Sequence, residues 1–423
     1  MEELITLHWV VGILFTICYL YQFMYIPVPW LLSKRKRPTP TDMSNKYAIL
    51  ICARNEEKVI ATLIESLFRQ TYKAENLHIF VLADNCTDNT ASVARAAGAD
   101  VYERRDTTHT GKGYALASLL CHLEWDYPEG FDGYFVFDAD NVLKPDYIEQ
   151  MDRVFSDGNE IVTSYRNSKN YGNNWISAGY ALWFLRESRY LNHARYLLGT
   201  SCAISGTGFM FSRSIAEELG GWPFHMLTED IQFSIYQVIK GRKIAFCPDA
   251  ELFDEQPVKF SQSWRQRLRW SRGFLQVFKG YGSKLAQGAL RGCFSCFDMT
   301  MTIMPALILS AFSVICDIIY VIWSASHGAN ILISLLFVCS LFTGMYMTLF
   351  AVGMITTITE WRHIHTTTFK KLFYTVTFPI FLFTYIPISI TALFVDPGWK
   401  PINHSVNFKL QPSSEGVLEE RKR

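Results

Sequence analysis

Charged side chains are scarce in this sequence. Aspartate, glutamate, lysine and arginine make up 19% of its 423 residues, compared with roughly 25% in a typical soluble protein. The net charge is only +1, so the chain has no overall attraction for a nucleic acid, and we expect no nucleic-acid partner. The scarcity is uneven, because the middle of the chain has the composition of a soluble protein while its two ends are apolar.

Spacings typical of a metal centre or a covalent nucleophile are also missing. Cys293 and Cys296 form the only close pair among ten cysteines, and no second pair or histidine cluster completes a zinc site. The other cysteines lie in apolar runs or beside polar loops, which indicates a reducing compartment. No serine or cysteine has a convincing histidine partner, so no covalent enzyme intermediate is expected.

The N-terminal apolar run predicts a membrane helix. Residues 4–32 contain no aspartate, glutamate, lysine or arginine, and about 20 apolar residues suffice to cross a bilayer. A cleaved signal peptide is the alternative, but the run is too long and lacks a positive segment before it. The basic cluster at residues 34–37 places the following domain in the cytoplasm. We therefore expect residues 1–33 to form a transmembrane helix.

Three further apolar runs predict more membrane segments within residues 299–396. They cover residues 299–324, 330–359 and 372–395. Pro379 and Pro387 lie inside the third run, which therefore either kinks as it spans or breaks into a short span and an interfacial piece. If all three of these C-terminal runs cross the membrane, the C-terminal tail lies outside. If the third run is broken, the tail stays inside. In both cases we expect a multi-pass protein of the plasma membrane, with the lipid bilayer as a partner.

The middle of the chain predicts an α/β domain over residues 34–260. Short apolar runs typical of buried strands alternate with stretches of helical periodicity. The strands are expected at residues 47–53, 77–83 and 133–137, and the helices at residues 59–68, 89–97 and 114–123. This alternation predicts a largely parallel sheet with helices on both faces. Ligands of such sheets bind beyond the carboxyl ends of the strands.

Residues 261–298 predict amphipathic helices at the membrane surface. One helical face is apolar and the remainder is rich in arginine; the apolar residues are Trp264, Leu268, Leu275 and Phe278. This pattern is typical of a helix that lies in the membrane interface. An ordinary surface helix is the alternative.

Carboxylates follow two of the predicted strands. Asp84 follows the second strand, while Asp138 and Asp140 follow the third as an Asp-x-Asp motif. Carboxylate oxygens suit a hard divalent cation such as Mg²⁺ or Mn²⁺, which would bridge a diphosphate. Aspartate is also common in loops because it favours turns, so the motif by itself leaves both interpretations open.

A second acidic motif is Thr228-Glu229-Asp230. A single carboxylate here can act as a general base that deprotonates an attacking hydroxyl. Thr228 can equally cap a helix whose dipole favours the two acidic residues, and on local grounds this interpretation is slightly favoured.

Residues 266–270 read Gln-Arg-Leu-Arg-Trp. Arg267 and Arg269 can neutralise a departing diphosphate, and the indole of Trp270 can stack on a sugar ring. The alternative is a basic interfacial helix that binds anionic lipid headgroups.

In this order, the motifs resemble those of family-2 glycosyltransferases of the cellulose synthase, hyaluronan synthase and poly-N-acetylglucosamine synthase type. That family carries an early Asp, an Asp-x-Asp, a Thr-Glu-Asp-like motif and Gln-x-x-Arg-Trp. The matching residues are Asp84, Asp138, Asp140, Glu229, Asp230, Gln266, Arg269 and Trp270. The resemblance runs from residues 53–57 to the C-terminal apolar runs. It implies a cytoplasmic catalytic domain of the GT-A, Rossmann-like fold.

The resemblance also implies roles for the matching residues. The nucleotide would be bound by Ala53, Glu56, Asp84 and Lys112, and its diphosphate by Asp138, Gln266, Arg267 and Arg269. The Mg²⁺ or Mn²⁺ ion would be bound by Asp140, and the general base would be Asp230, next to Glu229. The acceptor would be contacted by Trp270, Ser205, Gly206 and Thr207. A gating segment within residues 397–423 would include Trp399 and His404; this match is looser, because His404 stands where an Arg or Lys often occurs.

The implied reaction is an inverting single displacement, in which positioning and electrostatic stabilisation of the diphosphate carry the catalysis. The favoured interpretation is a processive synthase that polymerises a UDP-sugar, with UDP-glucose favoured over UDP-N-acetylglucosamine, and translocates the growing polysaccharide. The alternative is a non-processive transferase that adds one sugar to a membrane lipid, as ceramide glucosyltransferases do. A polymer channel would be lined by aromatic and polar groups, whereas a lipid acceptor requires a lateral opening to the bilayer.

Overall fold

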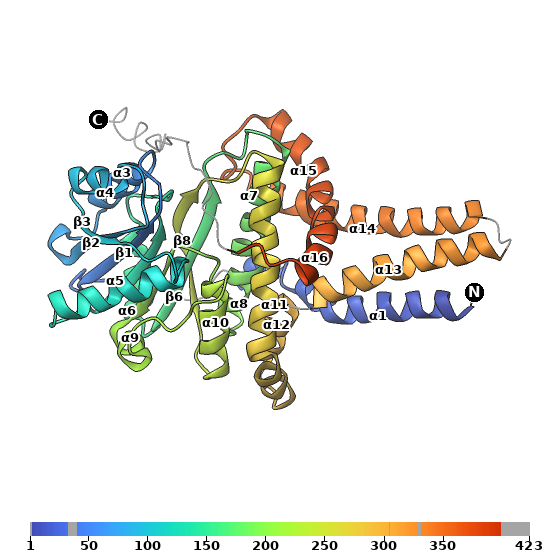
Figure 1. Ribbon diagram of the computed structural model, residues 1–423, viewed down its shortest axis with the longest axis horizontal. Coiled ribbons are helices and arrows are strands. Elements are labelled where there is room, and N and C mark those ends of the chain that lie inside the picture. The colour runs from blue at the N-terminus through green and yellow to red at the C-terminus, as the bar shows by residue number, and fades with distance from the viewer. Residues whose placement is uncertain (1, 33–39, 304, 328–330, 399–423) are drawn as a thin grey trace.

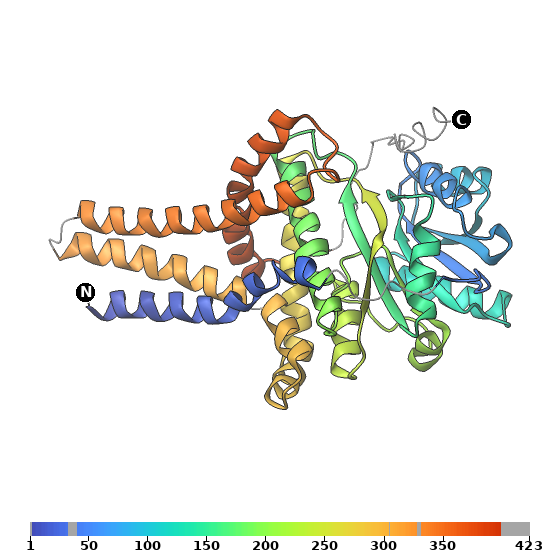
Figure 2. The ribbon, with the colours of Figure 1, turned by 180° about the vertical axis from the view of Figure 1, so that it is seen from behind.

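The computed structural model describes residues 2–32, 40–303, 305–327 and 331–398. An α/β body carries a bundle of helices that projects from one side (Figure 1). The bundle helices are α1 (Glu2–Met24), α13 (Pro305–Ser326) and α14 (Ile331–Thr359). The view from behind in Figure 2 shows the same projection, and α13 contacts both α1 and α14. The bundle is thus built from the two apolar ends of the sequence.

One mixed sheet of eight strands forms the centre of the body, in the order β3-β2-β1-β4-β7-β6-β8-β5. The strands are β1 (Tyr47–Ala53), β2 (Leu77–Asp84), β3 (Asp100–Arg104), β4 (Gly133–Asp138), β5 (Val142–Leu143), β6 (Ile161–Ser168), β7 (Phe209–Ser212) and β8 (Ala245–Asp254). Strands β1 to β4 pair in parallel, and three of them are the strands predicted from apolar runs. Strand β7 is antiparallel to both β4 and β6, and β6 pairs in parallel with β8, so one antiparallel strand separates two groups of parallel strands.

Helices cover both faces of the sheet, as predicted. Side chains alternate between the two faces of a strand. Leu50 of β1 therefore packs in the core beneath α5 (Lys112–Asp126) and α7 (Trp175–Arg186). Ile49 packs in the opposite core, beneath α3 (Ile60–Phe68) and α6 (Tyr147–Ser156). Because both side chains are fully buried, β1 is held from both sides and the position of its carboxyl end is fixed.

The third C-terminal apolar run is broken into α15 (Thr368–Phe383) and α16 (Tyr385–Phe394). The two helices run across the direction of the bundle in Figure 1, and they contact α7 and α11 (Phe260–Leu290), respectively. Pro387 weakens the helix at this point, because proline has no N–H to donate to the carbonyl four residues earlier. Next to this point, the hydroxyl of Thr384 donates to the carbonyl oxygen of Phe381 at 2.5 Å. Thr384 thereby stabilises the break.

Three stretches of the described residues are long and apolar enough to cross a membrane, namely Gly12–Leu31, Val338–Thr359 and Thr368–Phe394. The first two include parts of the bundle helices α1 and α14. The third is the α15–α16 pair, of which 33% is buried inside the protein, compared with 12% and 6% for the others. Apolar residues in α15 and α16 therefore pack against the body to a greater extent than those of the bundle.

A buried carboxylate, Asp298, fastens the N-terminal helix to the body. It lies on α12 (Phe294–Ile303), and Arg195 of α8 (His193–Leu197) donates to both of its oxygens, at 2.7 and 2.9 Å. The hydroxyls of Tyr21 and Tyr25 donate to the same carboxylate at 2.7 and 3.0 Å. The side chains of Arg195 and Asp298 are 1% and 0% exposed. Four donors therefore satisfy one fully buried acceptor.

Candidate active site

A cavity of about 990 Å³ lies at the carboxyl ends of the parallel strands. Its wall includes Ala53, Asp84 and Asp138, which are the last residues of β1, β2 and β4. The wall also includes apolar residues of the membrane-side helices, namely Leu20, Phe23, Leu341, Phe342, Met345, Leu349, Val352, Phe378, Leu382 and Ile386. One cavity thus joins a charged site at the sheet edge to an apolar space between the helices.

Asp84 forms part of the charged end, together with Ala53 and Glu56. The guanidinium of Arg104 on β3 contacts Asp84 Oδ1 at 2.7 Å and Asp106 Oδ2 at 2.9 Å. Burial raises the pKa of Asp84, and the hydrogen bond and charge of Arg104 only partly offset this effect. Arg104 therefore fixes the orientation of the carboxylate. Ala53, Glu56 and Asp84, three of the four residues expected to bind the nucleotide, thus line the same cavity.

Lys112 is a cation in the first turn of α5. Its Nζ donates to Asp138 Oδ1 at 2.5 Å and to the carbonyl oxygen of Gly206 at 2.7 Å. Burial lowers the pKa of Lys112, but the charges of Asp138 and Glu229 outweigh it, so the pKa lies above its ordinary value. A Cβ atom on the next residue, Gly113, would lie 2.0 Å from a backbone carbonyl oxygen. Only glycine therefore permits the close approach of the loop that precedes the acidic motif.

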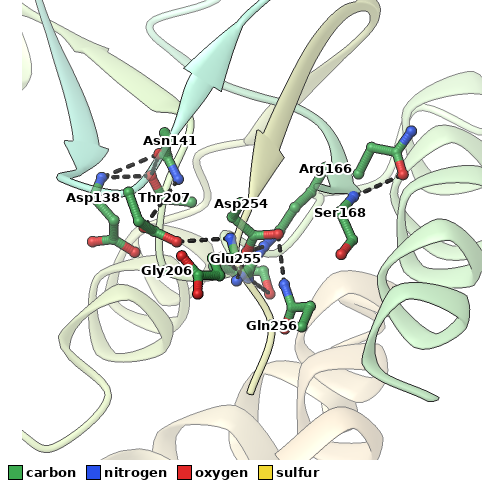
Figure 3. A network of polar contacts seen from close by, with 12 residues as sticks. Asp138, Asn141, Arg166, Ser168, Gly206, Thr207, Asp254, Glu255 and Gln256 are labelled. Carbon is green, nitrogen blue, oxygen red and sulfur yellow. Dashed lines mark hydrogen bonds and ion pairs between the residues drawn. The ribbon is translucent and has the colours of Figure 1, made fainter. Parts of the chain in front are cut away.

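Figure 3 shows the polar network that holds the turn from Asp138 to Asp140. The backbone N–H of Asp138 donates to Thr207 Oγ1 at 2.9 Å, and Thr207 donates to Asn141 at 2.5 Å. The backbone N–H of Glu255 donates to Asp140 Oδ2 at 2.8 Å. Thr207 is buried and is not among the described residues that line the cavity. The structure thus differs from the expectation for Thr207, which supports the Asp138 turn instead of facing an acceptor.

The oxygen donors at this turn fit a divalent cation. Mg²⁺ is usually held by one or two carboxylates together with substrate phosphates and water, and Mn²⁺ accepts similar ligands. Asp138 and Asp140 both line the cavity. In the described part of the chain, no group of three or more His, Cys, Asp or Glu side chains could hold a metal ion. A diphosphate would therefore have to supply the remaining ligands.

Glu229 and Asp230 begin α10 (Glu229–Ile239), and both line the cavity. The backbone N–H of Gly206 donates to Asp230 Oδ2 at 2.7 Å and so orients this carboxylate. Burial, and then the charge of Asp230, raises the pKa of Glu229 to about 7; burial also raises the pKa of Asp230. The side chain of Thr228 makes no capping hydrogen bond, so the structure does not show the helix cap that the local sequence favoured. An oriented carboxylate with a raised pKa has the properties of a general base.

Three residues of the Gln-Arg-Leu-Arg-Trp segment line the cavity: Gln266, Arg269 and Trp270. They are spaced i, i+3 and i+4 on α11, which places them on one face of the helix. Arg267 lies on a different face and is fully buried. It donates to the Phe381 carbonyl at 3.2 Å and to the Thr384 hydroxyl at 2.6 Å. The structure thus differs from the expectation that Arg267 binds a diphosphate, because its guanidinium ties α11 to the break between α15 and α16.

Arg166 and Glu187 are among the charged residues of the cavity that lie outside the sequence motifs. Arg166 on β6 donates to Asp254 Oδ2 at 2.6 Å and to the Ser205 carbonyl at 2.7 Å (Figure 3). Glu187 is the first residue of a π-helical turn, η2 (Glu187–Asn192), between α7 and α8. A π-helical turn has no local sequence signal, and Arg166 has no motif around it. Only the packing of β6 and α7 around the cavity reveals these two residues.

The remaining expected site residues divide into two groups. Ser205 and Gly206, expected to contact the acceptor, both line the cavity. Trp399 and His404, expected to form a gate, lie outside the described residues.

Residues 44–273 match the family model described as "Glycosyltransferase like family 2". Because the match covers more than half of the chain, the protein belongs to this family of glycosyltransferases. Its curated relatives include the "Probable glycosyltransferase YdaM" of Bacillus subtilis, which is 28% identical over 54% of this chain and 55% of that protein. A "Beta-monoglucosyldiacylglycerol synthase" of Synechocystis is 22% identical over 56% of this chain and 49% of its own. A "Poly-beta-1,6-N-acetyl-D-glucosamine synthase" of Staphylococcus aureus is 23% identical over 64% and 63%. The matched regions thus span about half to two thirds of these relatives.

A solved structure resembles this chain over almost its full length. The mannosyltransferase PcManGT from Pyrobaculum calidifontis, in complex with GDP-Man and Mn²⁺, has a TM-score of 0.58 and 17% sequence identity. The similarity covers 92% of this chain and 99% of that chain. The predicted fold class, an α/β GT-A domain with flanking helices of membrane-spanning length, is therefore confirmed.

Proposed function

We propose that this protein transfers one sugar from a nucleotide-sugar donor to a hydroxyl group of a membrane lipid, with inversion at the anomeric carbon. The observation that carries the proposal is the single cavity that joins Asp230 to an apolar space between α1, α14 and the α15–α16 pair. Aliphatic and aromatic side chains in that space suit acyl chains, because burial of apolar surface drives their binding. A lipid held there would present its headgroup to the carboxylates.

The proposed reaction is a single displacement. Asp230 takes the proton from the acceptor hydroxyl as its oxygen bonds to the anomeric carbon, while the bond from that carbon to the diphosphate breaks. Lys112 and Arg269 are placed to bind the departing diphosphate, since charge-assisted hydrogen bonds to phosphate are strong. The Nε of Arg269 is buried and has no hydrogen-bond partner among the described residues. A divalent cation bound by Asp140 would add positive charge at the leaving group.

The processive synthase favoured by the sequence motifs remains the second candidate. Trp270 supports it, because an aromatic face in the cavity suits a terminal sugar ring. A polymer, however, requires a channel wall of polar and aromatic groups, and the face that α14 contributes to this cavity is mainly aliphatic, with Leu341, Met345, Leu349, Val352 and Ile355. The lipid acceptor is therefore the better match. UDP-glucose is the first donor to be tested, followed by UDP-N-acetylglucosamine.

We propose that the bundle helices α1, α13 and α14 span the membrane, and that α15 and α16 lie at its cytoplasmic surface. The basic residues 34–37 after the first apolar run favour a cytoplasmic catalytic domain. The break at Thr384 and the packing of α15 on α7 favour an interfacial position for the last pair of helices. After the cytoplasmic catalytic domain, α13 and α14 would cross the membrane and return the chain to the cytoplasmic side, where the C-terminal tail would also lie. The protein would then be a multi-pass protein of the plasma membrane.

Product analysis tests the acceptor class. We expect purified protein in lipid vesicles to convert a radiolabelled donor into a monoglycosyl lipid that is extracted by organic solvent. The donor panel is UDP-glucose, UDP-N-acetylglucosamine and GDP-mannose, and release of the nucleoside diphosphate is measured in parallel. A water-soluble product of high molecular weight that a β-glycan hydrolase digests would instead establish the processive synthase.

Removal of divalent cations should abolish turnover. Asp140 offers one carboxylate to the ion, so the ion depends on both protein and donor and is open to chelation. We expect nucleoside diphosphate release to stop in excess EDTA and to return on addition of Mg²⁺ or Mn²⁺. Asp140→Asn should weaken activation by the metal, whereas Asp249→Asn, at an exposed aspartate, should not. Full turnover in EDTA would contradict the metal role.

Activity should fall as the pH is lowered through about 7. The base must be ionised to accept a proton, and burial raises the pKa values of both Glu229, to about 7, and Asp230. The coupled pair therefore takes up a proton near neutrality, unlike an ordinary exposed carboxylate. We expect kcat/KM to decline about tenfold per pH unit below this point. A profile that is flat down to about pH 5 would show that no such group controls the reaction.

A further inference from the structure

Glu187 is a carboxylate in the cavity that the proposed reaction does not use. It begins η2, where one widened turn interrupts the helical path between α7 and α8. Such turns are rare and frequently occur at functional sites. Glu187 and Asp230 line the same cavity. The widened turn thus contributes a second acidic side chain to the space in which an acceptor must lie.

The two carboxylates are anchored by neighbouring residues. The backbone N–H of Gly206 donates to Asp230, and the side chain of Ser205 hydrogen-bonds to Glu187. Burial raises the pKa of Glu187, and the charge of Asp230 raises it further. Ser205 and Gly206 are consecutive, so both carboxylates are contacted by one short segment of the chain.

Within the described residues, no cation lies within ion-pair distance of Glu187. The cations whose charges lower its pKa are paired elsewhere: Arg166 contacts Asp254, and Arg195 contacts Asp298. Glu187 is half-buried, and a carboxylate partly removed from water without an ion pair is costly unless hydrogen-bond donors satisfy it. Ser205 supplies one donor, and a carboxylate has room for several more. The remaining acceptor capacity of Glu187 is available to a ligand in the cavity.

We propose that Glu187 binds a second hydroxyl of the acceptor, so that the acceptor is a neutral lipid whose headgroup carries at least two hydroxyls. This inference rests on the proposed lipid acceptor. Neighbouring hydroxyls on one headgroup donate to Asp230 and Glu187, respectively. A fully ionised phosphate headgroup has no hydroxyl with which to donate to Glu187. Arg186 lines the cavity next to Glu187, and its guanidinium donates to Gln22 at 3.2 Å and lies over the Trp183 ring, so a phosphate acceptor belongs in the test.

A panel of matched acceptors tests this inference. Phosphatidylcholine vesicles are doped either with ceramide or 3-deoxyceramide, which differ in one hydroxyl, or with monoacylglycerol or its 2-O-methyl ether. A further set contains polyprenyl phosphate. We expect the wild-type protein to glycosylate each two-hydroxyl member at least about tenfold more efficiently than its partner, since a hydrogen bond to a charged group is at stake. This comparison needs no variant.

The variant Glu187→Gln adds a second measurement. It should raise the KM of the two-hydroxyl acceptors about tenfold and leave that of the one-hydroxyl acceptors unchanged, so that the preference disappears. Glu124→Gln, at an exposed position on α5, is the matched control, and UDP affinity checks that each variant is folded. Equal use of matched acceptors by the wild type, preference for polyprenyl phosphate, or an equal effect of Glu187→Gln on all acceptors would overturn the inference and leave the lipid transferase intact. Polymer without any lipid product would overturn both.

Discussion

Asp230→Asn is expected to lower turnover by at least ~10²-fold, the low end of a general base's contribution, while the protein still binds its donor. Asparagine keeps the size of the side chain, and its amide oxygen can still accept the hydrogen bond from Gly206 N–H, which lies at 2.7 Å from Asp230 Oδ2. It cannot take a proton from an acceptor hydroxyl. The loss should therefore appear in kcat, measured as nucleoside diphosphate release at saturating donor, and not in the dissociation constant of UDP.

The matched variant is Glu229→Gln, which removes the neighbouring carboxylate. Glu229 also lines the cavity, and its pKa is raised to about 7 by burial and by Asp230. If Asp230 is the base, Glu229→Gln should lower kcat much less and should change mainly the pH profile, because one member of the coupled pair is gone. A near-normal rate for Asp230→Asn, with a large loss for Glu229→Gln, would assign the base to Glu229.

The sequence predicts where the acidic residues Asp84 and Asp138 lie in the fold because these residues stand at the ends of predicted strands. Asp84 and Asp138 end β2 and β4, and the edge of a parallel sheet brings such residues together. The same reasoning fails at Arg267. Its chemistry suits a phosphate, but the helical rotation between neighbouring positions turns it into the α15–α16 junction. Residue type predicts what a side chain can bind, whereas helix phase decides where it lies.

Long-range packing accounts for the features that the sequence does not reveal. Arg166 and Glu187 reach the cavity from β6 and η2, and neither position has a local pattern. The antiparallel strand β7 joins two parallel groups of strands, and no apolar run distinguishes it from a parallel strand. The third C-terminal run was ambiguous because its prolines permit either a kink or a break. Contacts of α15 with α7 and of α16 with α11 accompany the break.

The aliphatic side chains that α14 contributes to the cavity also bear on the choice between polymer and lipid. Motifs shared by polysaccharide synthases and lipid transferases report the donor and the base, which both classes require. In the proposed lipid transferase, the acceptor would instead be contacted by residues of the helices, such as Leu341 and Met345 on α14, which line the cavity. Hydropathy alone cannot show whether such residues face a membrane or a cavity, since both surroundings favour apolar side chains. The acceptor class can therefore be inferred only from the positions of the helices around the site.

Asp298→Ala is expected to lower the free energy of unfolding by about 3–5 kcal/mol, the usual effect of breaking a buried ion pair. It leaves the guanidinium of Arg195, which is 1% exposed, without its carboxylate. The hydroxyls of Tyr21 and Tyr25 lose the same acceptor, so the N-terminal segment keeps only the hydrogen bond from the Tyr19 hydroxyl to the Met301 carbonyl among these tyrosine contacts with α12. Denaturant titration of the protein in detergent micelles measures the change. Asp396→Asn is the control, because the side chain of Asp396 is 57% exposed and its Oδ2 atom lies 4.0 Å from Nε of Arg272.

The double variant Arg195→Met/Asp298→Leu separates two contributions to the free energy of unfolding. One is the cost of a buried charge left without its partner, and the other is the net contribution of the intact ion pair. Replacement of a buried ion pair by apolar residues of similar volume is often neutral or stabilising. We therefore expect the double variant to recover most of the stability that Asp298→Ala loses. If it is as unstable as the single variant, the two tyrosine hydrogen bonds are the main contribution, and Tyr21→Phe with Tyr25→Phe should reproduce the loss. In either case, displacement of α1 would disturb the cavity wall at Leu20 and Phe23, so acceptor use should decline before donor binding does.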